Sequence, residues 1–127
     1  MIRHIGLNIN EEKELNDFYG DILGFSITEQ FTVTKERCRE IFGASKDFRV
    51  YRLEKFGLEL EIFVTDAINT PNYNHICLEY WKVSDIFARA KEKGYPVVTF
   101  LKDNGRRAYF IRDKAGNLFE IKEINHI

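Results

Sequence analysis

Two histidines and two glutamates occupy matching places in a sequence that nearly repeats itself. His4 and His75 open the similar stretches HIGL and HICL. Glu61 and Glu120 each lie in a run that reads Gly, three residues, Glu, Ile. Imidazole nitrogens and carboxylate oxygens are ligands for zinc, nickel, cobalt, iron and manganese. The repeat therefore predicts a divalent metal site to which each half of the chain contributes one His and one Glu.

Each of these residues, taken alone, has a commoner explanation. A strand histidine is more often a structural group than a ligand, and a strand glutamate is more often solvated. The equivalence of all four positions reverses that expectation and favours a metal site, functional or vestigial. Glu59 is the ambiguous residue, because it lies two positions before Glu61 and faces the same side of a strand. The repeat selects Glu61 and leaves Glu59 near the metal or in solvent.

The elements that must position these residues follow the same order in each half. Alternation of apolar and polar residues predicts strands at 2–9, 25–33, 48–54 and 58–64, and again at 75–80, 96–101, 106–112 and 117–124. Helices are expected after Asn10, over 35–42 and from about Ser84, with Asn10 and Ser84 as caps. The helix at 35–42 is present only in the first half.

A linker without periodicity is expected at about 65–74, where turn-forming residues are frequent. It would separate a first module, about 1–64, from a second, about 75–124, within the single domain that 127 residues allow. Apolar residues that alternate with the proposed ligands should face the helices. They are Ile5, Leu7, Leu58, Leu60, Ile62, Ile76, Leu78, Phe119 and Ile121.

Composition narrows the possible partners and the location. A formal net charge of -1 argues against a nucleic-acid binder. No apolar run approaches a membrane span and no signal-peptide pattern is present, so no membrane partner is expected. Cys38 and Cys77 form no metal-binding spacing. A reduced, cytoplasmic setting is therefore expected.

Several motifs resemble the vicinal oxygen chelate superfamily, which includes glyoxalase I, methylmalonyl-CoA epimerase, extradiol dioxygenases, and fosfomycin and bleomycin resistance proteins. The similarity covers essentially the whole chain. It rests on HIGLNI at 4–9, FYGDILGF at 18–25, LEIF at 60–63, HICL at 75–78 and FIRDKAGNLFEI at 110–121. The resemblance implies an α+β, glyoxalase-like fold of two tandem βαβββ modules that form a curled mixed sheet around a cleft. It also implies metal ligands at His4, Glu61, His75 and Glu120, the pattern nearest to glyoxalase I.

Some positions depart from the family pattern. Asn8 and Thr65 stand where glyoxalase I has an Arg and an Asn that help to hold glutathione, which counts against glutathione as co-substrate. Lys114 replaces a usual Pro in a turn, a change expected to be harmless. Fosfomycin-type enzymes and extradiol dioxygenases use three protein ligands, and bleomycin-type binders lack them. Retention of both glutamates therefore favours glyoxalase- or epimerase-like proton transfer.

The resemblance thus implies a metal-dependent lyase or isomerase, similar to lactoylglutathione lyase or to an epimerase, acting on a small molecule. Glu120 is the first choice as the catalytic base and Glu61 the second. The alternative is a resistance or ligand-sequestering protein of the same fold without catalysis, in which Trp81 would offer a stacking surface. Family members are commonly homodimers, so a homodimer is expected, with each site built from one chain or from two.

Overall fold

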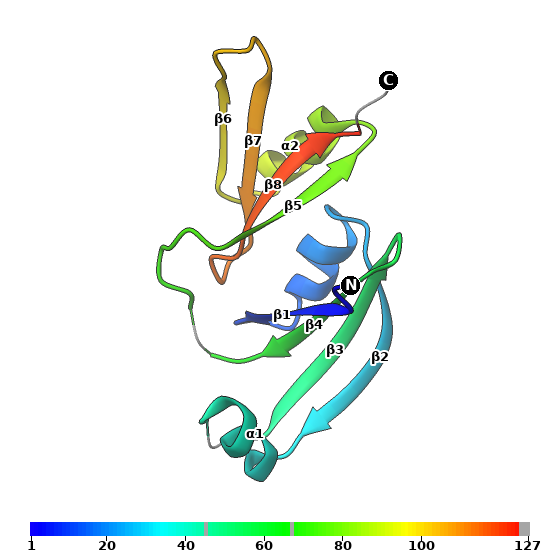
Figure 1. Cartoon of the computed structure of the whole chain (residues 1–127), viewed down its shortest axis with the longest axis vertical. Helices are drawn as coiled ribbons and strands as arrows, with labels where there is room; N and C mark the ends of the chain where they lie inside the picture. Colours follow the sequence, from blue (N-terminus) through cyan, green and yellow to red (C-terminus); the bar gives the residue numbers. More distant parts are fainter. Residues whose placement is uncertain (45, 67, 125–127) are drawn as a thin grey trace. The chain divides into compact units, whose positions relative to one another are not determined.

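Figure 1 shows the computed structural model of the chain, which describes residues 1–44, 46–66 and 68–124. The chain divides into two compact units, residues 1–67 and 68–127, called module 1 and module 2 below. The division falls inside the linker predicted at 65–74, of which Ala67 lies outside the described residues. Each module has its own sheet.

Module 1 is built on a mixed sheet of four strands. These are β1 (His4–Ile9), β2 (Ser26–Val33), β3 (Phe48–Lys55) and β4 (Leu58–Val64), in the order β1-β4-β3-β2. β1 runs parallel to β4, whereas the other neighbours are antiparallel. A π-helical segment, η1 (Leu15–Gly20), follows β1, and the helix α1 (Lys35–Phe42) joins β2 to β3.

Module 2 repeats this topology. Its strands are β5 (His75–Tyr80), β6 (Val97–Leu101), β7 (Arg107–Arg112) and β8 (Leu118–Glu123), in the order β5-β8-β7-β6, with β5 parallel to β8. The helix α2 (Val83–Glu92) follows β5. The predicted α+β fold of two tandem modules, each with a mixed sheet, is therefore confirmed. The additional helix of the first half is α1, which begins and ends as predicted.

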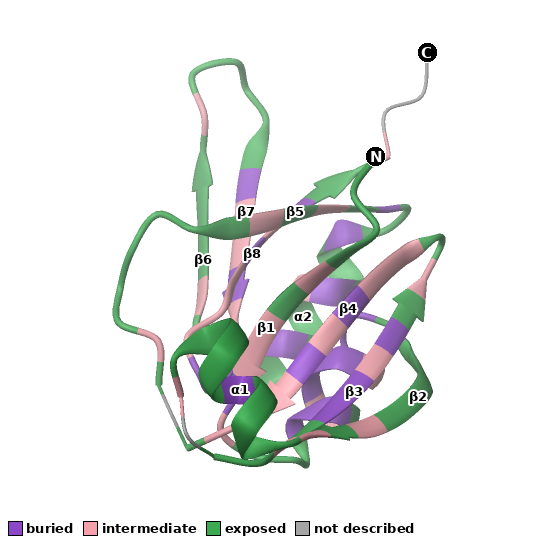
Figure 2. Cartoon of the chain, turned by 60° about the horizontal axis from the view of Figure 1, so that its bottom comes forward, coloured by how far each residue is buried: buried purple, intermediate pink, exposed green. Residues whose placement is uncertain are grey.

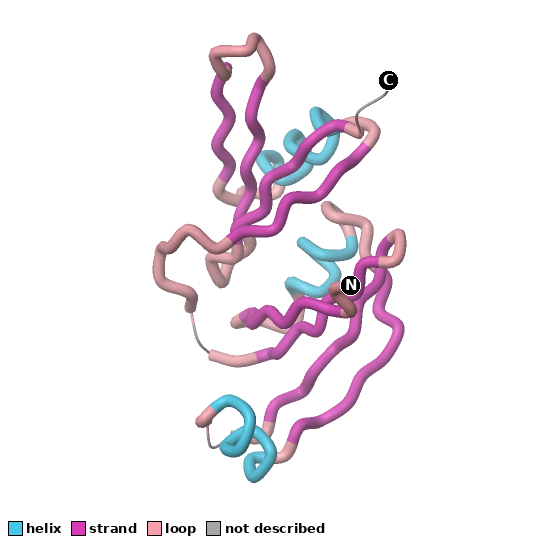
Figure 3. The backbone as a smooth tube through the Cα atoms, in the orientation of Figure 1, coloured by secondary structure: helices cyan, strands magenta, loops and turns pink. Residues whose placement is uncertain are grey.

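Strands make up most of the regular structure, as Figure 3 shows. The longest helix is α2, with ten residues. Within the residues that the structure describes, no helix is long and apolar enough to cross a membrane.

Alternate strand positions form the core of each module. Leu60 and Ile62 of β4, and Phe119 and Ile121 of β8, are buried between half-buried or exposed neighbours (Figure 2). The other predicted core residues are only half-buried: Ile5, Leu7, Leu58, Ile76 and Leu78. Four of these five lie on β1 and β5, which are the edge strands of their sheets and so have a neighbour on one side only.

Two predicted helix caps are wrong. The π-helical segment begins only at Leu15, because the preceding residues form turns in which Glu14 N–H donates to the Glu11 carbonyl at 3.1 Å. The side-chain oxygen of Asn10 is buried and has no hydrogen-bond partner among the described residues, so it caps nothing. Ser84 lies inside α2, which begins one residue earlier.

The turn between β7 and β8 is held by the residues of the DKAGN motif. The buried Asp113 carboxylate accepts hydrogen bonds from the backbone N–H and the side-chain amide of Asn117, both at 2.8 Å. Gly116 adopts φ of 92°, in the region that glycine alone enters readily. Arg112 Nη1 donates to the Gly116 carbonyl at 2.9 Å. These contacts fix the start of β8, which carries Glu120.

Candidate metal site

In module 1, His4 of β1 lies beside Glu61 of β4. The strand register sets His4 opposite Glu59 and Gly6 opposite Glu61. The His4 ring nevertheless reaches diagonally to Glu61, where Nε2 lies 3.1 Å from Oε1. The His4 side chain is 41% exposed and that of Glu61 14%, so a solvent ion can reach the pair.

In module 2, His75 of β5 makes the same diagonal approach to Glu120 of β8. His75 lies opposite Leu118 and Cys77 opposite Glu120, and His75 Nε2 lies 3.7 Å from Glu120 Oε1. The other ring nitrogen, Nδ1, is 2.9 Å from the carbonyl oxygen of Tyr73. A carbonyl only accepts, so in the neutral ring Nδ1 carries the proton and the Nε2 lone pair faces Glu120. Metal-bound histidines commonly have this arrangement.

The spacing of the donors suits a metal ion. With ligand bonds near 2.0–2.2 Å, two neighbouring ligands of one ion lie about 3.0–3.5 Å apart. The separation in module 1, 3.1 Å, falls in this range, and that in module 2, 3.7 Å, lies just above it. In the described part of the chain, no cluster of three or more His, Cys, Asp or Glu is gathered for a metal. Each pair thus brings together two candidate donor atoms within its own module.

Arg52 is a member of the module 1 site that the sequence analysis missed. It lies on β3 directly opposite Glu61, and its Nη2 donates to Glu61 Oε2 at 2.7 Å. Nη1 donates to Glu29 Oε2 at 2.6 Å, and the guanidinium lies 5.6 Å from the Phe31 ring centre. The hydrogen bond to Glu61 is the main cause of a raised Arg52 pKa. The only sequence signal was a charged residue between the apolar Tyr51 and Leu53.

Glu120 has different neighbours. Phe110 occupies the position on β7 that Arg52 occupies on β3, and its ring stacks against Phe100 with centres 6.2 Å apart. Lys122 Nζ lies 3.9 Å from Glu120 Oε2. Partial burial, and after it the charge of Glu120, raises the pKa of the Cys77 thiol. Glu120 therefore lies between an aromatic surface, a thiol and a loosely placed ammonium group.

The two remaining candidates from the sequence, Glu59 and Trp81, do not lie at the His–Glu pairs. Glu59 is opposite His4 on one side and Glu54 on the other, and its charge contributes to the raised pKa of Arg52. Trp81 is exposed and follows the last residue of β5, whereas His75 is the first. At about 3.3 Å per residue, the strand separates them by roughly 20 Å. Trp81 therefore cannot stack on a small ligand held at His75.

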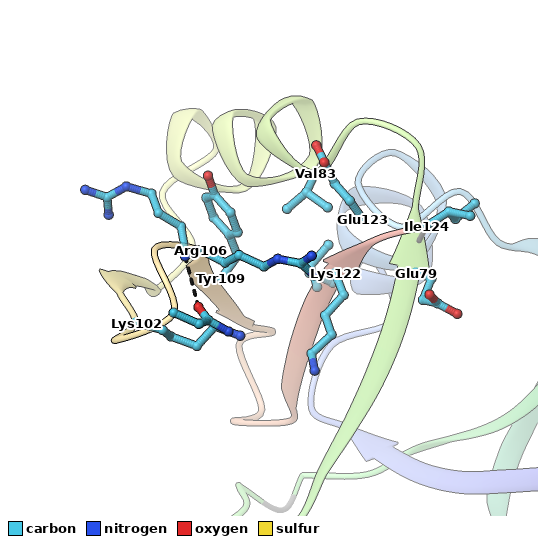
Figure 4. A pocket seen from close by; sticks show the side chains of 11 residues that line it. Glu79, Val83, Lys102, Arg106, Tyr109, Lys122, Glu123 and Ile124 are labelled. Atoms are coloured by element: carbon cyan, nitrogen blue, oxygen red, sulfur yellow. Dashed lines mark hydrogen bonds between the residues drawn. The ribbon is translucent and has the colours of Figure 1, made fainter. Parts of the chain in front are cut away.

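A separate pocket of about 820 Å³ opens in module 2, where β7 and β8 part (Figure 4). The two strands pair only through Phe110–Arg112 and Leu118–Glu120. Beyond that point the β6–β7 hairpin, β8 and the start of α2 surround the pocket. Its charged lining residues are Lys102, Arg106, Arg107, Lys122, Glu79 and Glu123. None of the four proposed metal ligands lines it.

Comparisons with known proteins agree with this fold. Residues 1–121 match the Glyoxalase/Bleomycin resistance protein/Dioxygenase superfamily. A glyoxalase family protein from Enterococcus faecalis is 21% identical, with 95% of each chain covered and a TM-score of 0.71. The fosfomycin resistance protein FosX from Listeria monocytogenes is 18% identical, with 98% of this chain and 93% of FosX covered and a TM-score of 0.76.

The structure of a FosX variant contains Mn(II) and 1S,2S-dihydroxypropylphosphonic acid. That variant is 18% identical to this chain, with 96% of this chain and 88% of the variant covered and a TM-score of 0.73. No curated protein sequence matches the chain. The match over residues 1–121, together with the repeated modules, shows that the chain belongs to the Glyoxalase/Bleomycin resistance protein/Dioxygenase superfamily.

Proposed function

We propose that this protein is a metal-dependent lyase or isomerase that moves a proton next to a carbonyl of a small substrate. The observation that supports this most is the repeated His–Glu pair, with donor atoms 3.1 and 3.7 Å apart at equivalent register positions. His4, Glu61, His75 and Glu120 would together hold one divalent ion, whether zinc, nickel, cobalt, iron or manganese. The Mn(II) in the FosX variant supports a divalent metal in this fold.

The bound metal would supply Lewis acidity, which stabilises the negative charge that develops on substrate oxygens. The protein's own part is proton transfer, and Glu120 is the better base. Glu61 Oε2 already accepts a 2.7 Å hydrogen bond from Arg52, so this oxygen is not available to take a proton. Apart from His75, the basic group that the described residues bring nearest to Glu120 is the Lys122 ammonium, 3.9 Å from Oε2. Glu120 would remove the proton beside the carbonyl and return it to the neighbouring carbon.

Hydrogen exchange tests this proposal without knowledge of the full reaction. The metal-loaded protein is incubated in D₂O with a panel of small 2-oxo compounds and thioesters, with and without glutathione, and deuterium at the carbon beside the carbonyl is measured by NMR. The proposal predicts exchange that needs the metal and does not need glutathione, since Asn8 and Thr65 replace the residues that would hold it. Absence of exchange for every compound in the panel would contradict the proposal.

A binding protein without catalysis is the second candidate, and one observation favours it. Val98 and Phe100 of β6 are exposed, and with the stacked ring of Phe110 they form an apolar surface on the Glu120 face of module 2. Under this alternative, Glu120→Gln would leave binding of a ligand unchanged and no compound would undergo exchange.

We also infer a homodimer in the cytoplasm that binds a small molecule and neither nucleic acid nor membrane. The inference of a dimer comes from the superfamily, and each metal site could use ligands of one chain or of two. The two cysteines, Cys38 and Cys77, are both unpaired, as a reducing compartment would leave them. Sedimentation at low micromolar concentration should give the mass of a dimer, and a monomer alone would remove this inference.

A further inference from the structure

Arg52 makes contacts that divide the Glu61 carboxylate into two differently used oxygens. Oε2 accepts from Arg52 Nη2 at 2.7 Å, whereas Oε1 lies 3.1 Å from His4 Nε2. The guanidinium therefore occupies the oxygen that faces away from the histidine and does not compete for the other one. A hydrogen bond between two charged groups of this kind is short and directional.

The Arg52 side chain is itself held on a second side. Nη1 donates to Glu29 Oε2 at 2.6 Å, and the guanidinium lies against the ring of Phe31. Glu29 and Phe31 lie on β2, Arg52 on β3 and Glu61 on β4, so one side chain ties three neighbouring strands together. The planar guanidinium can reach two carboxylates at once, which a lysine ammonium on a flexible stem does less well.

Module 2 provides the contrast within the same chain. Phe110 replaces Arg52 opposite Glu120, and the donor separation there is 3.7 Å in place of 3.1 Å. Lys122, the nearest cation to Glu120, stands 3.9 Å away with a side chain that is 52% exposed. Among the residues that the structure describes, only the glutamate of module 1 is thus fixed by a hydrogen-bonded arginine.

We propose that Arg52 is a positioning residue that fixes Glu61 with Oε1 turned toward His4, so that module 1 presents a preassembled pair of metal donors. This inference rests on the proposed metal-dependent function. It assigns the two glutamates different tasks: Glu61 is a fixed ligand, and Glu120 is the ligand that also takes up and releases a proton. Groups that orient a metal ligand in this way typically contribute 10- to 100-fold to metal affinity.

The test is a Co²⁺ titration of metal-stripped full-length protein, followed by calorimetry and by the visible absorption of bound Co²⁺. Arg52→Met keeps an unbranched, flexible stem and removes the donors, and should weaken binding by about 10- to 100-fold and change the spectrum. Arg52→Lys keeps the positive charge but loses the planar guanidinium with its two donor nitrogens, and should retain more of the affinity than Arg52→Met does. Lys122→Met is the matched control in module 2 and should change the affinity by less than about threefold, because an exposed cation 3.9 Å away contributes little.

A double variant separates positioning from a general effect on folding. If Arg52 acts through Glu61, Arg52→Met should cause no further loss of affinity in a Glu61→Gln background. Wild-type affinity and spectrum in Arg52→Met, or equal losses with and without Glu61, would overturn the positioning role while leaving the proposed function intact. A wild-type protein that binds no Co²⁺ would overturn the proposed function and this inference together.

Discussion

Module 1 and module 2 share a topology but surround their glutamates differently. In both, the first strand runs parallel to the last and brings a histidine diagonally to a glutamate. In module 1 the third strand supplies Arg52 opposite that glutamate, whereas in module 2 it supplies Phe110. The pairing of β1 with β4, and of β5 with β8, therefore places the His and Glu donors. The next strand, β3 or β7, determines how firmly the carboxylate is held.

The same contrast extends to charge. Residues 1–67 contain nine Lys and Arg against thirteen Asp and Glu, and residues 68–127 contain ten against seven. The formal charges are therefore -4 and +3, although the whole chain is at -1. Near-neutrality of the chain conceals two modules of opposite sign, so conclusions from net charge apply to the whole chain and not to each module.

The largest effect should come from the glutamates themselves. Glu120→Gln should lower metal-dependent proton exchange by about 10²- to 10⁴-fold while most of the metal stays bound, because an amide oxygen can still face the ion but cannot accept a proton at neutral pH. Glu61→Gln should mainly weaken metal binding. Exchange rate and metal content measured on both variants distinguish the two. Glu59→Gln is the control and should do little; loss of exchange there, with full exchange in Glu120→Gln, would mean that the repeat selected the wrong carboxylates.

The core of module 1 should tolerate truncation poorly. Leu60 is fully buried beside Glu61, and Leu60→Ala should lower the free energy of unfolding by about 2–5 kcal/mol through lost burial and a cavity. Urea denaturation followed by far-UV circular dichroism measures this. Leu58→Ala, at a half-buried position of the same strand, should cost clearly less. Equal costs would show that the start of β4 is packed as tightly as its middle and would contradict the difference in burial between these two residues of the same face.

The turn that begins β8 should be the next most sensitive feature. Asp113→Ala leaves the N–H and the amide of Asn117 without their acceptor in a buried turn, and should cost about 1–3 kcal/mol of unfolding free energy. Asp103→Ala, in the exposed hairpin between β6 and β7, should stay within about 0.5 kcal/mol of wild type. Thermal denaturation of both variants would check this, and similar costs would show that the Asp113 contacts contribute nothing special.

The smallest effect concerns Cys77, which stands where module 1 has Gly6. Although Cys77 is exposed, partial desolvation and then the charge of Glu120 raise its thiol pKa, so at pH 8 less thiolate is present than in a cysteine without these neighbours. Alkylation by iodoacetamide should accordingly be slow, and Glu120→Gln should accelerate it severalfold by removing the negative charge. Cys38 is fully buried and serves as an unreactive reference within the chain. An unchanged rate would show that Glu120 does not influence the thiol.

Much of the fold could be predicted from the sequence, because alternation and glycine positions are local signals. The bounds of α1, β4 and β5 are those predicted, and Gly43 ends α1 at φ of 71°. The caps at Asn10 and Ser84 were wrong: turns separate Asn10 from η1, since Asn is as much at home in turns as at caps, and α2 begins one residue before Ser84. Burial of β1 and β5 was overestimated, because the residues of a strand do not indicate whether it lies at the edge of its sheet.

The candidate site could be predicted only as far as the repeat extends. The alignment of the halves favoured Glu61 over Glu59, and the structure places Glu61 beside His4. Arg52 has no counterpart in the second half, so no repeat could mark it. Its place opposite Glu61 depends on the register between β3 and β4, which follows from the turn at Gly57 and not from the type of residue 52.

Metal stoichiometry tests the central claim, that both His–Glu pairs serve one ion, most directly. Protein purified without added metal is stripped, titrated with Co²⁺ and compared with His4→Ala and His75→Ala. We expect one ion per chain in the wild type and a loss of affinity well beyond 100-fold in each variant, because each removes a nitrogen donor outright. Two ions per chain, or a variant of either histidine that binds as tightly as the wild type, would contradict it.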